Sequence, residues 1–124
     1  MINLVAVAVG GALGALGRYG ANGLIYPLMG SKFPLATLVV NVVGAILMGI
    51  FYVLILEKAM LAPEWRNFVM VGFLGAFTTF SAFSLDALAL WQNGHFLLAL
   101  VYIFLNVVLC LTGIALAIYI TRLL

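Results

Sequence analysis

Charged residues are scarce in this chain: five Lys or Arg and three Asp or Glu side chains among 124 residues, or 6%. A soluble domain carries about 25% charged residues, because its water-exposed surface is built largely from them. This scarcity, together with a hydrophobic content of 68%, excludes an ordinary soluble domain and indicates an integral membrane protein. The net charge of +2 is also too small to indicate a nucleic-acid partner.

Residues that carry catalytic or metal chemistry are equally few. Cys110 is the single cysteine, which excludes an intrachain disulfide, and His95 is the single histidine. The sequence contains no metal-ligand spacing, nucleophile triad or phosphate-binding loop. Its glycine-rich run at residues 10–18 follows no strand, so it does not indicate a dinucleotide site. We therefore expect a protein that is not an enzyme.

Long apolar stretches account for almost the whole chain. A helix that crosses the membrane needs about 20 apolar residues, and short turns marked by Pro, Gly, Asn and charged residues divide this sequence into four such stretches. The sequence predicts an all-α integral membrane protein, one transmembrane domain over residues 1–124, with helices at about residues 2–26, 34–57, 64–92 and 96–121.

The loop charges hardly specify an orientation in the membrane. Four spans put both chain ends on one side, and that side also holds Lys58, Arg66 and Arg122. The opposite side holds Lys32 and His95. The positive-inside rule needs a clearer excess than this. Either the orientation is poorly specified, or the chain inserts both ways and forms antiparallel dimers.

Polar residues within the predicted spans gather in one half of the membrane, which favours the second reading. Because successive helices run in opposite directions, the half away from the chain ends receives nearly all of them. Two copies packed antiparallel would supply polar groups to both halves. These residues are Arg18, Asn22, Thr37, Asn41, Asp86, Tyr102 and Asn106.

Several of these polar residues lie four positions apart, as in Arg18 and Asn22, and therefore share a helix face. Such rows can line a path or bond one helix to another. Arg18 remains charged in the membrane, and two roles are open. It can form a neutralising ion pair with Asp86, which lies at a similar depth, or act as a positive attractor at the mouth of an anion path. The small-residue spacing of Gly10 and Gly14 favours helix packing.

The run GFLGAFTTFSAFS, residues 72–84, predicts a break near the centre of the third helix. Gly72, Gly75 and the two following threonines weaken the helix there, and irregular backbone at this depth has to be buried in protein or line a cavity. Freed carbonyls bind small hard cations. Phe80 and Phe83 follow on one face, and their positive ring edges, with nearby serine hydroxyls, suit a small dehydrated anion. Plain packing is the alternative for the rings.

The same run, with GALGRY at residues 14–19 and NVVG at residues 41–44, resembles the small bacterial fluoride channels, the Fluc or CrcB family. The resemblance covers essentially the whole chain. It implies an antiparallel, dual-topology homodimer in the bacterial plasma (inner) membrane, with two pores and a structural sodium ion at the dimer interface. It further implies passive, selective fluoride export that protects the cell.

The resemblance also implies roles for individual residues. The backbone carbonyls of Gly75 and Thr78 match donors to the sodium ion. The sequence departs from the family pattern at Ala76, Ala82 and Cys110. The residues that match the anion path are Phe80, Phe83, Asn41, Ser81, Arg18, Tyr102 and Thr37.

Two other functions are compatible with four short spans. A small dual-topology, proton-coupled exporter of the multidrug type needs a membrane-embedded acid in its first helix. The first predicted helix here has Arg18 and no acid, which argues against this function. A helper subunit without transport activity is the second alternative, and it predicts that substitution of Phe80 or Phe83 leaves fluoride flux unchanged.

Overall fold

All regular structure in the computed structural model is helical over residues 1–28 and 33–124, which are the residues that it describes. The sequence predicts the turn between the first two spans at Pro27, Gly30, Ser31 and Lys32, and the last three of these residues lie outside the described ranges. Within the described residues, four helical stretches are long and apolar enough to cross a membrane: Ile2–Leu28, Leu35–Glu57, Arg66–Gln92 and Phe96–Leu123. The prediction of an all-α protein with four spans is confirmed.

Three of the four spans change their helical winding along their length. The elements are α1 (Ile2–Ile25), the 3₁₀ turn η1 (Tyr26–Leu28), α2 (Leu35–Phe51), the π-helix η2 (Tyr52–Glu57), the π-helix η3 (Arg66–Leu74), α3 (Gly75–Phe77), α4 (Phe80–Gln92) and α5 (Phe96–Leu123). The ends of the spans agree with the predicted boundaries within about two residues. The π-helical segments were not predicted.

Sequence signals explain where the third span ends. Asn93 follows the last residue of α4, and Gly94 has a φ of +83°, a left-handed conformation that glycine adopts without strain. The N–H of His95 then donates to the carbonyl of Leu90 at 2.9 Å, which satisfies one carbonyl of the last turn. This tight connection allows α5 to run back alongside the earlier helices.

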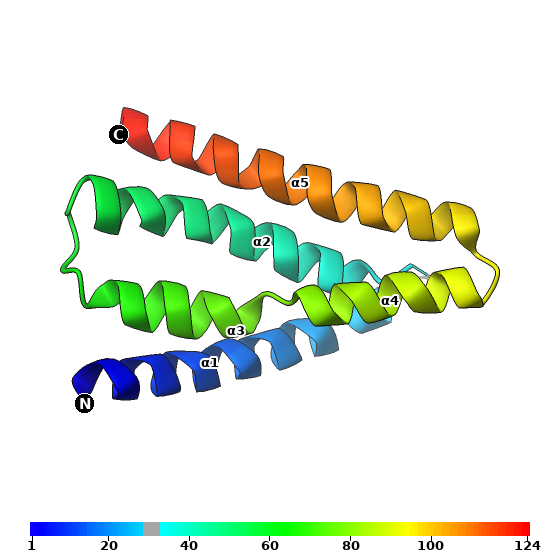
Figure 1. Cartoon of the computed structure of the whole chain (residues 1–124), viewed down its shortest axis with the longest axis horizontal. Helices are drawn as coiled ribbons and strands as arrows, with labels where there is room; N and C mark the ends of the chain where they lie inside the picture. The colour runs from blue at the N-terminus through cyan, green and yellow to red at the C-terminus, as the bar shows by residue number, and fades with distance from the viewer. Residues whose placement is uncertain (29–32) are drawn as a thin grey trace.

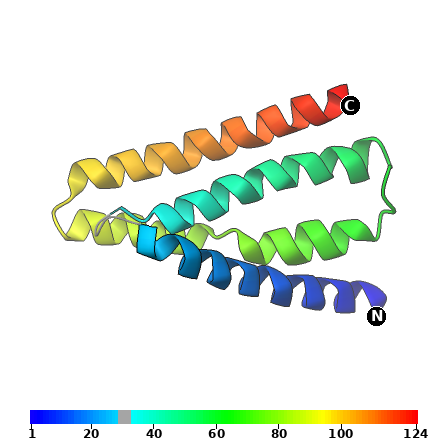
Figure 2. The same cartoon turned by 180° about the vertical axis from the view of Figure 1, so that it is seen from behind.

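The four spans lie lengthwise beside one another, and both chain ends are at the same end of the bundle (Figures 1 and 2). The first span, α1, packs mainly on η3, and α2 packs along α5. At the end that holds the termini, Arg122 of α5 donates through Nε to Oε1 of Glu57 at 2.7 Å. The interruption between α3 and α4, in the third span, lies about halfway along the bundle (Figure 1).

Glycines allow α1 and η3 to approach closely. A Cβ atom at Gly14 would overlap the backbone of Phe73, and one at Gly72 would lie 2.9 Å from the carbonyl oxygen of Val7. The packing role of Gly10 and Gly14 is thereby confirmed, since Gly10 faces the carbonyl of Phe68 in the same way. Gly72 lies inside η3 and serves this packing, and its weakening of the third helix stays a prediction.

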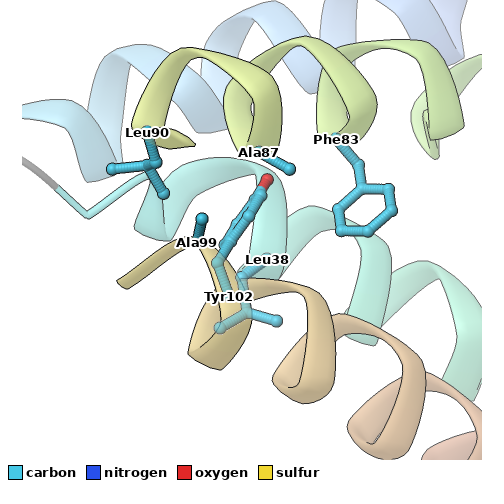
Figure 3. Packing of buried hydrophobic residues seen from close by; sticks show 6 residues of the cluster. All are labelled: Leu38, Phe83, Ala87, Leu90, Ala99 and Tyr102. Atoms are coloured by element: carbon cyan, nitrogen blue, oxygen red, sulfur yellow. The ribbon is translucent and has the colours of Figure 1, made fainter. Parts of the chain in front are cut away.

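A cluster of buried residues fixes α4 against α5 and the start of α2. Tyr102 is completely buried at its centre and reaches from α5 toward α4, with Phe83 and Ala87 beside it (Figure 3). Leu38 contributes from α2. This cluster sets the position of the first two turns of α4, where the predicted site residues lie. The other members shown in Figure 3 are Leu90 and Ala99.

Candidate functional site

The third span is interrupted at Thr78 and Thr79, here called the break. Thr78 has φ −84° and ψ 158°, and Thr79 has φ −154° and ψ 119°, so both are extended. The side chains of the two threonines stabilise the flanking helix ends. Thr78 Oγ1 donates to the carbonyl of Leu74 at 2.9 Å, and Thr79 Oγ1 accepts from the N–H of Ala82 at 3.1 Å. Thr79 is thus the N-cap of α4, a position that threonine favours.

Asn41 of α2 pairs with the backbone of Thr79. Its Oδ1 accepts from the Thr79 N–H at 2.9 Å, and its Nδ2 donates to the Thr79 carbonyl at 3.0 Å. We call this pair of hydrogen bonds the amide clamp. The bond to the Thr79 N–H replaces a helical hydrogen bond that the extended backbone cannot make, which is necessary because the hydrocarbon core offers no water to do so.

The break removes the helical donors of four carbonyls, those of Gly75, Ala76, Phe77 and Thr78, and the Ala76 carbonyl accepts from Arg18 instead. In a continuous α-helix the N–H of Thr79 would donate to Gly75, and the N–H of Ala82 would donate to Thr78. Here the first N–H donates to Asn41 and the second to Thr79 Oγ1. The carbonyls of Gly75 and Thr78 are therefore available as oxygen ligands. Over residues 1–28 and 33–124, no cluster of three or more His, Cys, Asp or Glu side chains offers another metal site.

Arg18 also binds the broken helix. Its Nε donates to the carbonyl of Ala76 at 3.3 Å, an interaction that places a cation at the carbonyl end of α3. Asp86 has a different partner, since its Oδ2 accepts from the Tyr102 hydroxyl at 3.1 Å. The structure thus pairs Arg18 with Ala76 and Asp86 with Tyr102, and the predicted alternative of an ion pair between Arg18 and Asp86 is not formed.

Aromatic rings extend from the break into the buried cluster. The ring centroids of Phe80 and Phe83 lie 5.3 Å apart, and those of Phe83 and Tyr102 lie 5.4 Å apart. Phe83 is 8% exposed, whereas Phe80 is 77% exposed within the single chain. Phe83 is therefore part of the folded core, while Phe80 projects from the break outward.

A cavity of about 390 Å³ brings several predicted site residues together. Asn41, Thr78, Phe80 and Phe83 all line it. Its remaining wall comes mainly from small and apolar residues of α2 and α5, and its polar groups come from the centre of the bundle. These lining residues include Gly44, Ala45, Met48, Thr79, Asn106, Val107, Cys110, Leu111 and Ile114.

The other predicted residues lie around this cavity and do not line it. Thr37 lines a second cavity of about 690 Å³ together with Asp86. Ser81 is exposed, with its Oγ 3.3 Å from Thr79 Oγ1. Tyr102 is buried between the two regions, and Arg18 contacts the break from the α1 side. Of the predicted path residues outside the third span, Asn41 and Arg18 thus contact the break, whereas Thr37 and Tyr102 lie beside α4.

Two residues of the site were not assigned to it from the sequence. Thr79 provides both the N-cap of α4 and the backbone that Asn41 holds. Asn106 is 5% exposed, and its Oδ1 accepts from Asn41 Nδ2 at 3.3 Å. The signal for Asn106 was its amide at membrane depth, but its partner depends on how α2 and α5 pack.

A comparison with known protein families shows to which family this chain belongs. The family model described as CrcB-like protein, Camphor Resistance (CrcB), matches residues 5–118. The chain belongs to the CrcB family. The resemblance drawn from the motifs of the first, second and third spans is thereby confirmed, and the chain is a multi-pass bacterial membrane protein.

Curated relatives in the CrcB family match over nearly their full length. A protein of Saccharophagus degradans named "Fluoride-specific ion channel FluC" is 56% identical over 122 residues, which cover 98% of this chain and 91% of that protein. Proteins of the same name from Hahella chejuensis and Coxiella burnetii are 48% and 40% identical, with 98% of this chain covered in each case and 95% and 98% of the relatives. These relatives are named as channels, in agreement with the expectation of a protein that is not an enzyme.

Proposed function

We propose that this chain is a fluoride-selective ion channel that exports fluoride passively across the bacterial inner membrane and so protects the cell. The observation that carries the proposal is the break in the third span, with Phe80 and Phe83 directly after it and lining one cavity with Asn41. Three relatives that align over 98% of this chain are named as fluoride-specific channels.

The physical requirement for such a channel is to replace the water around a small anion. An isolated ion in a medium of low dielectric constant costs tens of kcal/mol by a Born estimate. The positive edges of Phe80 and Phe83, together with hydroxyl donors such as Ser81, offer fluoride a substitute for part of its hydration shell. Arg18 beside the break adds positive potential that raises the local anion concentration.

The proposal includes an antiparallel homodimer. Phe80 is 77% exposed at the middle of a span, and Ser81 and Ser84 beside it are also exposed. Within one chain Ser84 donates to the Phe80 carbonyl and Ser81 pairs with Thr79, and lipid offers these hydroxyls no further partners, so this face is better covered by protein. A second copy, inserted in the opposite direction, would bring its own break to the same depth and would complete a path on each side of the interface.

The proposal also includes a structural sodium ion at the dimer interface. The carbonyls of Gly75 and Thr78 fit this ion, because the break removes their helical donors and two copies would present four oxygens. When bound, sodium would supply fixed positive charge between the two breaks. Its removal should abolish conduction, whereas a constant ratio of sodium to fluoride transported would contradict a structural role.

The function is tested with purified protein in liposomes loaded with potassium fluoride, with fluoride efflux followed by an electrode. We expect rapid efflux once valinomycin provides a potassium shunt, and no comparable efflux of chloride from matched liposomes. Efflux that proceeds equally well without valinomycin would indicate proton-coupled exchange and would contradict the proposal. Protein-free liposomes provide the background rate.

A further inference from the structure

Asn106 is a buried amide in a helix that is otherwise apolar around it. It lies on α5 with 5% of its surface exposed, and both ends of its side-chain amide are bonded. Its Nδ2 donates to the carbonyl of Tyr102, one turn earlier, at 3.0 Å. Its Oδ1 accepts from Nδ2 of Asn41 at 3.3 Å. The side chain thus connects the backbone of α5 to the amide clamp on α2.

We infer that Asn106 is a positioning residue for the conduction path: it sets the orientation of the Asn41 amide and, through it, the extended conformation of the break. The inference concerns the amide clamp itself, and its consequence for flux rests on the proposed channel function. Asn106 bonds to Asn41, and Asn41 bonds to Thr79. We call this series of hydrogen bonds, which starts at the Tyr102 carbonyl, the relay.

The direction of each hydrogen bond in this relay fixes the next one. The Tyr102 carbonyl accepts only, so the NH₂ group of Asn106 has to face it and the oxygen of Asn106 has to face Asn41. That oxygen can only accept, so the NH₂ group of Asn41, and not its oxygen, has to face it. An inverted Asn41 amide would oppose oxygen to oxygen at both Asn106 and the Thr79 carbonyl, and NH₂ to N–H at the Thr79 nitrogen. A single arrangement therefore satisfies all partners.

This arrangement occupies the donors of Asn41. The NH₂ group of Asn41 has two hydrogens, and the structure gives it two acceptors, the Thr79 carbonyl and Asn106 Oδ1. Donation from Asn41 to a passing anion would require release of one of them. Asn41 therefore holds the break, and Asn106 keeps its amide in the orientation that does so.

The test compares Asn106→Leu, which keeps the number of side-chain heavy atoms and the branch point but has no amide, with Asn106→Ser, whose hydroxyl can donate to the i−4 carbonyl and still accept. Thr121→Val is the matched control, because Thr121 is also a buried polar residue of α5, 5% exposed, but lies near the chain's end. Two quantities are measured on each protein: hydrogen exchange of the Thr79 amide in lipid nanodiscs, and the sodium concentration that gives half-maximal fluoride efflux from liposomes.

We expect Asn106→Leu to accelerate exchange at Thr79 and to raise the half-maximal sodium concentration by about threefold to tenfold, since a membrane hydrogen bond contributes on average about threefold to an equilibrium and two are lost. Asn106→Ser should recover most of both changes, and Thr121→Val should show neither. The inference is overturned if Asn106→Leu matches wild type in Thr79 exchange, or if Thr121→Val shifts both quantities equally. Absence of fluoride efflux from wild type would instead refute the channel function, and Thr79 exchange would still test the relay.

Discussion

The side chain of Asn41 holds the backbone of Thr79 by two hydrogen bonds, accepting from its N–H at 2.9 Å and donating to its carbonyl at 3.0 Å. One residue of α2 thereby stabilises the point at which the third span ceases to be helical. Backbone groups at membrane depth need such partners, because each unsatisfied group costs several kcal/mol. The break can therefore persist as a defined structure from which Phe80 projects.

Replacement of Asn41 by leucine should abolish this support. Asn41→Leu leaves the N–H of Thr79 without a partner and removes one donor from its carbonyl, which as the N-cap carbonyl also accepts the first hydrogen bond of α4. We therefore expect fluoride efflux from liposomes to fall at least tenfold. Val43→Leu is the control, because Val43 is exposed on the same helix and 41% accessible. Equal rates in Asn41→Leu and wild type would show that the break does not depend on the amide clamp.

Substitutions of Phe80 and Phe83 should have different effects on protein stability but the same effect on fluoride flux. Phe80 is 77% exposed in the single chain, whereas Phe83 is 8% exposed and packs against Tyr102. We expect both Phe80→Ile and Phe83→Ile to reduce fluoride efflux to the background rate. Only Phe83→Ile should also lower the melting temperature of the detergent-solubilised protein. Unchanged flux in both variants would favour the helper-subunit function.

The effect of a glycine-to-alanine substitution in α1 on stability should depend on how closely the added methyl group approaches η3. A Cβ at Gly14 would overlap the backbone of Phe73, whereas one at Gly11 would lie 3.9 Å from the nearest atom, the carbonyl oxygen of Gly72. Gly14→Ala should destabilise the protein by about 1–3 kcal/mol, as overpacking does, and Gly11→Ala should be nearly neutral. Thermal unfolding in detergent measures both. Equal stability of the two variants would contradict the close approach of α1 and η3.

Variants of Arg18 should separate its charge from its hydrogen bond. Nε of Arg18 donates to the Ala76 carbonyl at 3.3 Å. Arg18→Lys keeps a cation near the break, and Arg18→Gln keeps an N–H donor without charge. We expect the lysine variant to retain more fluoride efflux than the glutamine variant, with the difference largest at low ionic strength, where charges are least screened. Greater activity of the glutamine variant would contradict an electrostatic role.

Much of the fold could be predicted because a lipid environment restricts the possibilities. Four apolar stretches separated by short polar turns fix the number of spans, and the signals at Asn93 and Gly94 fix one end to the residue. The π-helical winding of η3 could not be predicted. No residue of Arg66–Leu74 marks this winding in the sequence, and the close approach of Gly10 and Gly14 to the same segment exists only once the helices pack.

The sequence predicted which residues form the site better than it predicted the contacts between them. Phe80, Phe83 and Asn41 were identified from the sequence, and they line one cavity. The partner of Asn41 is a backbone group, and a backbone group carries no sequence signal of its own. The role of Asn106 depends in the same way on the register of α5 against α2, which residue types alone do not specify.

The most direct test of the account is the orientation of the chain in intact bacteria. A single cysteine is placed at the exposed residue Leu124 in a Cys110→Ser background that retains fluoride efflux, and a maleimide that cannot cross the membrane is added from outside. The antiparallel assembly predicts that about half of the copies are labelled and that the rest react only after the membrane is opened. Labelling of all copies, or of none, from one side would contradict a path completed by an oppositely inserted copy.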